Sequence, residues 1–196
     1  MPTAKQAEQV TIPQLNVRRF QITLIGDSQL VCHKWSEKAK RAMLDKQMKR
    51  ATPKKEAKDP EQDYRDSLYH HPGGGYGFPT IAFKSAAVDA ASYVGGLTKV
   101  MCRGAFHVIG DYAKIEGEPQ IREDMVRIAM GTADLRYRAE FRAWRTTLDI
   151  RLNPTVLSLE QLVNLFNHAG FSVGVGEYRP QRDGSWGMFH VATDGE

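Results

Sequence analysis

The stretch 158–191 contains the residue types that bind phosphate and stack on nucleobases. Arg179 and Arg182 supply two guanidinium groups. Tyr178 and Trp186 supply aromatic rings close to them. Guanidinium groups pair with phosphate oxygens, whereas aromatic rings offer a sequence-tolerant face to bases. These four side chains therefore predict contact with a sugar-phosphate strand.

Glycines are concentrated in the same stretch. Gly174 and Gly176 stand just before the two cationic residues. Glycine lets a backbone come close to another group, because it has no Cβ and tolerates positive φ. The loop could therefore point backbone N–H groups at phosphate oxygens. The alternative is that these glycines only shape a bend, and that Asp183 and Gly184 form an ordinary hairpin turn.

A second group of cationic residues shows the alternation of a strand. Arg136 and Arg138 flank Tyr137, so a strand would turn both guanidinium groups to one side. Arginines with a neighbouring aromatic ring suit contact with phosphates and bases. The alternative is a ladder of ion pairs with nearby carboxylates. Those carboxylates are Glu123, Asp124, Asp134 and Glu140.

Positive charge is concentrated between residues 34 and 58. This segment holds ten Lys and Arg residues and three acidic ones, in a chain whose net charge is +4. Such a concentration indicates an anionic partner, usually nucleic acid. Lys34, Lys38 and Arg41 are the residues that we expect to take part. The alternative is a solvated helix face followed by a flexible loop rich in lysine.

A third cationic position stands where a strand is expected to meet a helix. Small residues from Ser85 onward predict a helix whose first turn could be approached closely by a ligand. Lys84 immediately precedes it. Unpaired N–H groups and the helix dipole attract anions to such a position. A small-residue helix packed tightly on a sheet would look the same.

Only weak signs of catalysis are present. His33 beside Lys34 could supply a base and a cation for RNA cleavage without a metal, and Asp27 is a second candidate. A partly buried histidine would fit the same context. Cys32 and Cys102 lack the spacing of a zinc site, so we expect reduced thiols, no metal and no cofactor.

Composition is that of a globular protein. The 196 residues are 41% hydrophobic and 26% charged, which suffices for one well-buried core. No apolar run approaches the roughly 20 residues of a membrane span. The first residues do not resemble a secretory signal. We therefore expect a cytoplasmic protein with no membrane partner.

The order of predicted elements indicates an α+β fold. We expect a ferredoxin-like or RRM-like antiparallel sheet with helices on one face. The expected strands are 20–24, 106–109, 148–152 and 188–191. The expected helices are 36–50, one starting at 85, and 158–170, in which Gly170 forms the left-handed stop. The expected divisions are an arm 1–15, a domain 16–191 with insertions at 51–77 and 110–145, a mobile loop 51–66 inside the first insertion, and a tail 192–196.

Three segments of the sequence resemble the RAMP superfamily, which includes the backbone subunits of CRISPR effector complexes. Segment 25–31 resembles the exit of the first strand. Segment 78–86 is similar to the family's strand-to-helix turn, with Lys84 at the family's lysine and Ser85 where a glycine is usual. Segment 174–189 resembles the glycine-rich loop. Separately, residues 33–39 resemble early proteins of tailed bacteriophages, which would place the protein in a bacterial or phage-infected cell.

The RAMP resemblance implies a subunit that lies along single-stranded nucleic acid, usually RNA, and stacks head to tail on copies of itself. It also implies that residues 122–145 could form a hairpin that wedges between bases. Some members cut RNA, so a metal-independent endoribonuclease is an alternative. A phage scaffold protein that assembles without nucleic acid is another. The binding hypothesis requires Lys84, Arg136 and Arg179 to meet in one positively charged groove.

Overall fold

The central sheet contains the alternating strands that the sequence predicts. The structure is a computed structural model that describes residues 14–50, 57–128, 131–193 and 195. In it, β1 (Arg18–Gly26) pairs antiparallel with β9 (Arg145–Leu152). Ile22 and Leu24 are buried, whereas Gln21 is exposed. Alternation in the sequence thus gives one buried and one outward face, as expected.

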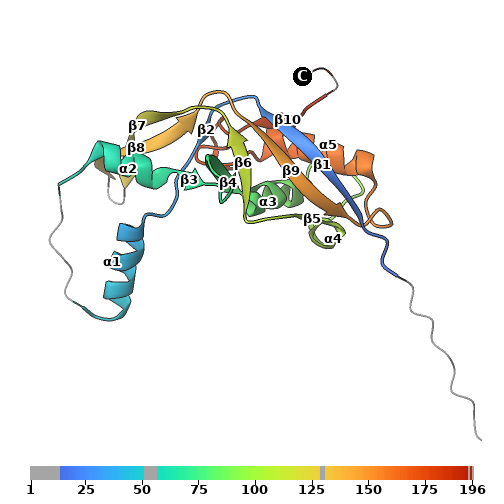
Figure 1. The fold of residues 1–196 in the computed structure, drawn as a ribbon, viewed down its shortest axis with the longest axis horizontal. Coiled ribbons are helices and arrows are strands. Elements are labelled where there is room, and N and C mark those ends of the chain that lie inside the picture. The colour runs from blue at the N-terminus through green and yellow to red at the C-terminus, as the bar shows by residue number, and fades with distance from the viewer. Residues whose placement is uncertain (1–13, 51–56, 129–130, 194, 196) are drawn as a thin grey trace, which may run out of the picture.

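The predicted ferredoxin-like arrangement is confirmed. Four strands form its sheet in the order β10-β1-β9-β6, all neighbours antiparallel. Helix α3 precedes β6, and helix α5 connects β9 to β10 (Figure 1). The bounds are β6 Tyr112–Glu116, β10 Phe189–Val191, α3 Thr80–Ala90 and α5 Leu159–Ser172. The edge is extended by β4 (Tyr76–Pro79) and β3 (Tyr69–His70), and β5 (Phe106–Val108) pairs with the far end of β9 after α4 (Lys99–Ala105).

A second, three-stranded sheet has the order β2-β8-β7. Its bounds are β2 Leu30–Val31, β7 Pro119–Ile128 and β8 Thr132–Phe141. The β7–β8 hairpin extends away from the main sheet, and α2 (Pro60–Ser67) packs against it (Figure 1). Because Tyr112–Glu116 belongs to the main sheet, the segment that departs from that sheet is shorter than the predicted 110–145.

The hydrophobic core lies between the main sheet and the helices α3 and α5. Leu148 and Ile150 from β9 are each at most 1% exposed. They belong to one buried cluster with Phe83 of α3 and Phe166 of α5, which are fully buried. Burial of large apolar side chains is the main source of stability in a domain of this kind.

Helix α1 (Glu37–Gln47) begins where the sequence predicts. The Ser36 side chain accepts a hydrogen bond from the Ala39 backbone N–H, at 3.2 Å, which is the expected N-cap contact. None of its residues is buried, and Figure 1 shows the helix standing apart from the sheet. Its exposed surface includes Lys38 and Arg41.

The expected loop 51–66 is wrong in its second half, since α2 begins at Pro60. Asp59 accepts a hydrogen bond from the Gln62 N–H at 3.1 Å, and Pro60 occupies the first helical position. Both features start helices, because the cap satisfies a free donor and proline has no N–H to leave unpaired. Residues 51–56, and the predicted arm up to residue 13, lie outside the described residues.

The predicted helix start at Ser85 is also wrong. Helix α3 begins at Thr80, so Lys84 lies in its second turn and not at its N-terminus. The Thr80 N–H donates to the Asp111 carbonyl at 3.0 Å, and the Thr80 hydroxyl donates to the Gly110 carbonyl. The first N–H of the helix is therefore bonded within the protein, and Lys84 lies one turn beyond the N-terminus at which the sequence places it.

The predicted stop at Gly170 is wrong for a different reason. Helix α5 starts with the expected capping box, in which Ser158 and Gln161 each bond the other's backbone N–H. It then continues through Gly170 to Ser172. A Cβ on Gly170 would lie 1.6 Å from the Phe189 carbonyl oxygen. Glycine is therefore needed for the close packing of β10 on the helix, and Gly174, with φ of +67°, provides the left-handed turn.

Candidate nucleic-acid interface

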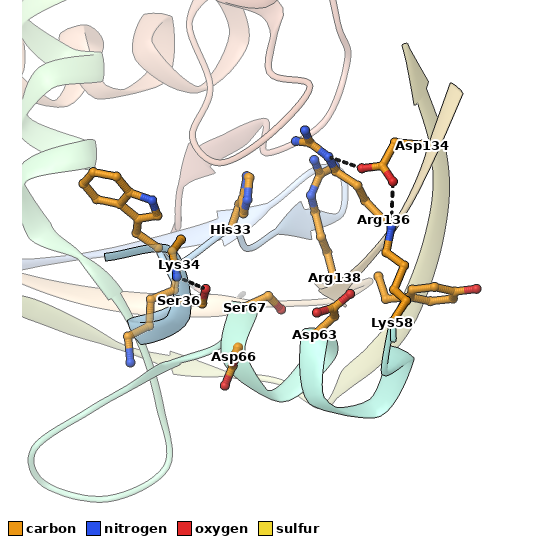
Figure 2. A pocket seen from close by; sticks show the side chains of 13 residues that line it. His33, Lys34, Ser36, Lys58, Asp63, Asp66, Ser67, Asp134, Arg136 and Arg138 are labelled. Carbon is orange, nitrogen blue, oxygen red and sulfur yellow. Dashed lines mark hydrogen bonds and ion pairs between the residues drawn. The ribbon is translucent and has the colours of Figure 1, made fainter. Parts of the chain in front are cut away.

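Two adjoining cavities lie where the hairpin, α2, α3 and the glycine-rich loop come together. The hairpin cavity, about 370 Å³, is formed by residues 33–36, Lys58, α2 and the β8 residues Asp134, Arg136, Tyr137 and Arg138 (Figure 2). The loop cavity, about 340 Å³, is formed by α3 and residues 173–181. His33 contributes to both. Arg136 of the hairpin and Arg179 of the glycine-rich loop therefore line two adjoining cavities, and the single positively charged groove stays a prediction.

The glycines of the loop approach the protein's own backbone. Gly176 has φ of +79°, and a Cβ there would lie 2.7 Å from the Val31 carbonyl oxygen. A Cβ on Gly187 would lie 1.7 Å from the Val175 carbonyl oxygen. The N–H groups of Val175 and Glu177 donate to the carbonyls of Gly187 and Val31. The expectation that these amides face a ligand is therefore wrong, because they are used in holding the loop to itself and to β2.

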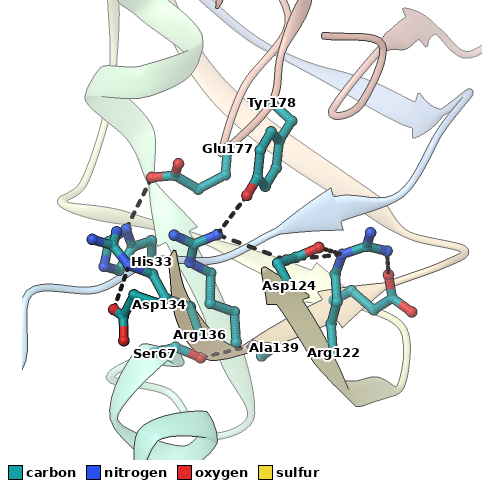
Figure 3. A network of polar contacts seen from close by, with 11 residues as sticks. His33, Ser67, Arg122, Asp124, Asp134, Arg136, Ala139, Glu177 and Tyr178 are labelled. Carbon is teal, nitrogen blue, oxygen red and sulfur yellow. Dashed lines mark hydrogen bonds and ion pairs between the residues drawn. The ribbon is translucent and has the colours of Figure 1, made fainter. Parts of the chain in front are cut away.

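One face of the β7–β8 hairpin carries a network of ion pairs. The Arg122 Nε donates to the Asp124 carboxylate at 2.9 Å, and its Nη1 donates to Glu140 at 2.9 Å (Figure 3). Arg142 donates to the same Glu140 at 3.1 Å. Arg122 stands opposite Arg138 in the strand register. This is the ion-pair ladder that the sequence left open as an alternative, with Asp124, Asp134 and Glu140 as its acids.

The predicted base-stacking rings are in contact with this network. The Arg122 guanidinium lies over the Trp186 ring, 4.0 Å from its centroid. Tyr178 and Trp186 pack edge to face, with 4.6 Å between their ring centroids. Arg138 Nη1 donates to the Tyr178 hydroxyl at 3.3 Å. These two rings therefore join the glycine-rich loop to the hairpin, because each has a protein cation beside it.

Arg136 and Arg138 share one face of β8, as the alternation predicts, but differ in burial. Arg138 is 3% exposed, and its Nη1 lies 3.7 Å from Asp124. Its Nε is buried without a hydrogen-bond partner. The Arg136 side chain is 37% exposed and lies 3.6 Å from Asp134, which Lys58 also contacts at 2.8 Å. Only Arg136 of the pair is therefore open to a large ligand.

His33 stands between the two cavities and contacts a carboxylate from the loop. Its Nδ1 lies 3.0 Å from Glu177 Oε1, and the two side chains are 42% and 39% exposed. The hydrogen bond to His33, aided by the charges of His33, Arg138 and Arg179, lowers the pKa of Glu177 despite its partial burial. A carboxylate that orients an imidazole is a common feature of proton-transfer sites.

Stability should fall in acid as this carboxylate is protonated. A lowered folded-state pKa means that Glu177 stabilises the protein above the ordinary carboxyl range near pH 4.3, and that this contribution is lost as pH drops through its folded value. We expect Glu177→Gln to lose less stability than the natural protein between about pH 6 and pH 3 in urea unfolding. Glu116→Gln, at an exposed carboxylate of β6, is the control. Parallel curves for all three proteins would contradict this expectation.

The two catalytic candidates have different partners. Asp27 Oδ1 lies 2.6 Å from His190 Nδ1, whereas His33 pairs with Glu177. Asp27 lines neither cavity. Within the described residues, no three His, Cys, Asp or Glu side chains are grouped so as to hold a metal ion. Cys32 and Cys102 are free and buried.

The other predicted residues divide between the site and other surfaces. Lys34 and Tyr137 line the hairpin cavity, and Ser85, Gly174, Gly176 and Arg179 line the loop cavity. Lys84 lines neither; its Nζ lies 3.0 Å from His107 Nδ1, and burial lowers the pKa of this lysine. Arg182 is exposed in the short helix η2 (Pro180–Arg182), outside both cavities. Lys38 and Arg41 lie on exposed α1, which begins at the rim of the hairpin cavity.

Sequence reasoning missed the part of the cavity that α2 provides. Asp63, Asp66 and Ser67 line it, and the Ser67 hydroxyl accepts a hydrogen bond from the Ala139 N–H of β8 at 2.8 Å. The available signal was Asp59 followed by Pro60, a pair typical of a helix start.

The part of the chain that the structure describes contains no helix with the length and apolar content to cross a membrane.

Comparison with known proteins does not assign the chain to a family. No protein-family model matches the chain, and no curated protein sequence does so. Among solved structures, the chain is similar to the crystal structure of Cmr6 from Pyrococcus furiosus, with 10% identity and a TM-score of 0.43 over 91% of this chain and 100% of that one. The resemblance to RAMP proteins and to phage early proteins therefore stays a prediction, whereas the α+β fold rests on the structure itself.

Proposed function

We propose that this protein binds single-stranded nucleic acid along the surface formed by the hairpin cavity and the loop cavity. The supporting observation is that the two cavities share His33 and bring together Lys34, Arg136 and Arg179 from three separate parts of the chain. Cations spaced along a surface suit a backbone with one negative charge per nucleotide. RNA is the first ligand to test, because the RAMP resemblance implies it.

Exposed groups beside the cavities suit a strand that continues beyond them. Trp35, 53% exposed, and Tyr137 line the hairpin cavity and offer rings on which bases can stack. Helix α1 carries Lys38 and Arg41 away from the rim of that cavity. A strand leaving the hairpin cavity would therefore meet further positive charge.

Binding should depend steeply on salt and on these three cations. We expect the triple variant Lys34→Ala, Arg136→Ala, Arg179→Ala to lower the slope of log affinity against log salt by about two, because each contact with a single strand contributes about 0.7. The loss of affinity should be similar for nucleic acids of unrelated sequence, since phosphate contacts carry no sequence information. Fluorescence anisotropy with labelled RNA and DNA 20-mers measures both effects.

A matched control separates the site from total charge. The variant Arg103→Ala, Arg142→Ala, Arg151→Ala removes an equal number of positive charges, three, from exposed positions that line neither cavity. It should retain most of the affinity. Equal losses in the two triple variants would mean that binding is not located here, and no binding at low salt would favour the self-assembling scaffold. Sedimentation of the complex with RNA of increasing length tests head-to-tail assembly along the strand.

A nuclease is the second candidate, and it rests on the contact between His33 and Glu177 at the junction of the cavities. A carboxylate can fix the tautomer of an imidazole that acts as a general base, and nearby Arg136 could stabilise charge on a phosphate. Cleavage of RNA that persists in a chelator and disappears in His33→Ala would establish this function. Intact RNA after long incubation would exclude it.

A further inference from the structure

One residue that lines the hairpin cavity has an unsatisfied, buried cationic donor. Arg138 is 3% exposed, and its Nε–H has no hydrogen-bond partner although the residue lines the cavity. Buried donors are nearly always paired in folded proteins, because an unpaired one loses its hydrogen bonds to water without replacement. A charged donor at a cavity wall is therefore a sign that something else completes it.

A second guanidinium lies beside the first. Arg136 and Arg138 project from the same face of β8, and their side chains lie next to each other in Figure 2. Their acidic partners are at longer range than elsewhere in the hairpin: 3.6 Å for Arg136 and 3.7 Å for Arg138, against 2.9 Å for Arg122. Two neighbouring cations with loosely held counter-ions favour an anion between them.

The position of Arg138 limits the kind of anion that can reach it. A phosphodiester inside a nucleic-acid strand has a sugar on both sides and would have to bring both into the cavity. A terminal phosphomonoester has only one, and it carries more negative charge, about −1.5 to −2 at neutral pH. The cavity volume of about 370 Å³ lies within the range of small-ligand sites.

We propose that the hairpin cavity binds the terminal phosphomonoester of a single-stranded nucleic acid, held by the guanidinium groups of Arg136 and Arg138. The terminal base would then lie near the rings of Trp35 and Tyr137, which line the same cavity. This assignment rests on the proposed nucleic-acid binding and adds to it a preference for one end of the strand. The 5′ and 3′ ends offer the same group, so the experiment must distinguish them.

The test compares one internally labelled RNA 10-mer with a 5′-phosphate, with a 3′-phosphate, and with hydroxyl groups at both ends. We expect one phosphorylated form to bind at least about tenfold more tightly than the hydroxyl form, the effect of one charge-assisted contact. Arg136→Gln should abolish this preference, whereas Arg142→Gln, at a side chain 72% exposed outside the cavity, should keep it. Arg138→Lys should also abolish it, with thermal unfolding used to confirm folding.

The outcomes separate the two proposals. Equal affinity for the three RNAs would overturn the terminal-phosphate site and leave the nucleic-acid binding intact. A preference for the phosphorylated RNA that survives Arg136→Gln would also overturn the terminal-phosphate site. Arg136 is partly exposed, so this variant tests the site without replacing a buried residue. Failure to bind any of the RNAs at low salt would overturn the proposed function and this assignment with it.

Discussion

Replacing Gly170 with alanine should destabilise the protein by about 1–2 kcal/mol, although alanine favours helix. Helix propensity alone would give a gain of about 0.5–1 kcal/mol. The added Cβ, however, would lie 1.6 Å from the Phe189 carbonyl oxygen and 2.5 Å from its carbon. Both atoms are backbone, so β10 must move away from α5, and overpacking of this kind typically costs about 1–3 kcal/mol or more. Urea or thermal unfolding measures the change.

Gly104→Ala is the matched control, since Gly104 is also a helical glycine. A Cβ added there would have no atom from outside its own helix within 4 Å, and Gly104 is exposed in α4. We expect this change to stabilise the protein by about 0.5–1 kcal/mol. If both variants gained stability, the packing of β10 on α5 described above would be wrong.

Removing Arg122 should cost about 2–3 kcal/mol, the loss of hydrogen bonds to charged groups, and less than a fully unpaired buried charge, because Arg142 and Arg138 remain beside its two acids. Arg122 bonds both Asp124 and Glu140, whose side chains are only 11% and 5% exposed. Arg122→Met would leave these carboxylates short of positive charge and would remove the contact with Trp186. Chemical denaturation gives the loss, and adding Asp124→Asn and Glu140→Gln should restore part of it.

Arg142→Met provides the comparison, because Arg142 bonds the same Glu140 from a side chain that is 72% exposed. Exposed ion pairs contribute about 0–1 kcal/mol, so little loss is expected. Similar losses for the two variants would show that the hairpin network does not depend on burial.

Local patterns in the sequence predicted much of the fold. The alternation of Ile22 and Leu24 and of Leu148 and Ile150 is that of strands with one buried face, and the structure has them so. The capping box at the start of α5 was equally clear, because it needs only two residues three positions apart. Such signals depend on neighbours in sequence, which is why they could be interpreted without coordinates.

The role of the glycines could not be predicted from the sequence, because the absence of a Cβ allows close contact either with a ligand or with the protein's own backbone. A missing Cβ admits a ligand or another part of the same chain, and Gly176 and Gly187 admit the chain. Contacts such as that of Arg122 with Trp186 join residues that are far apart in sequence. Helix α2 was missed because its residues show no apolar period, although its start signal was present.

The pairing of β1 has a consequence for synthesis on the ribosome. This strand is made early, but both of its partners, β9 and β10, are made late. Until they emerge, β1 has two open edges and an apolar face with nothing to cover it, a state that is prone to aggregation. The pairing of β1 can therefore be completed only after β9 and β10 have been synthesised.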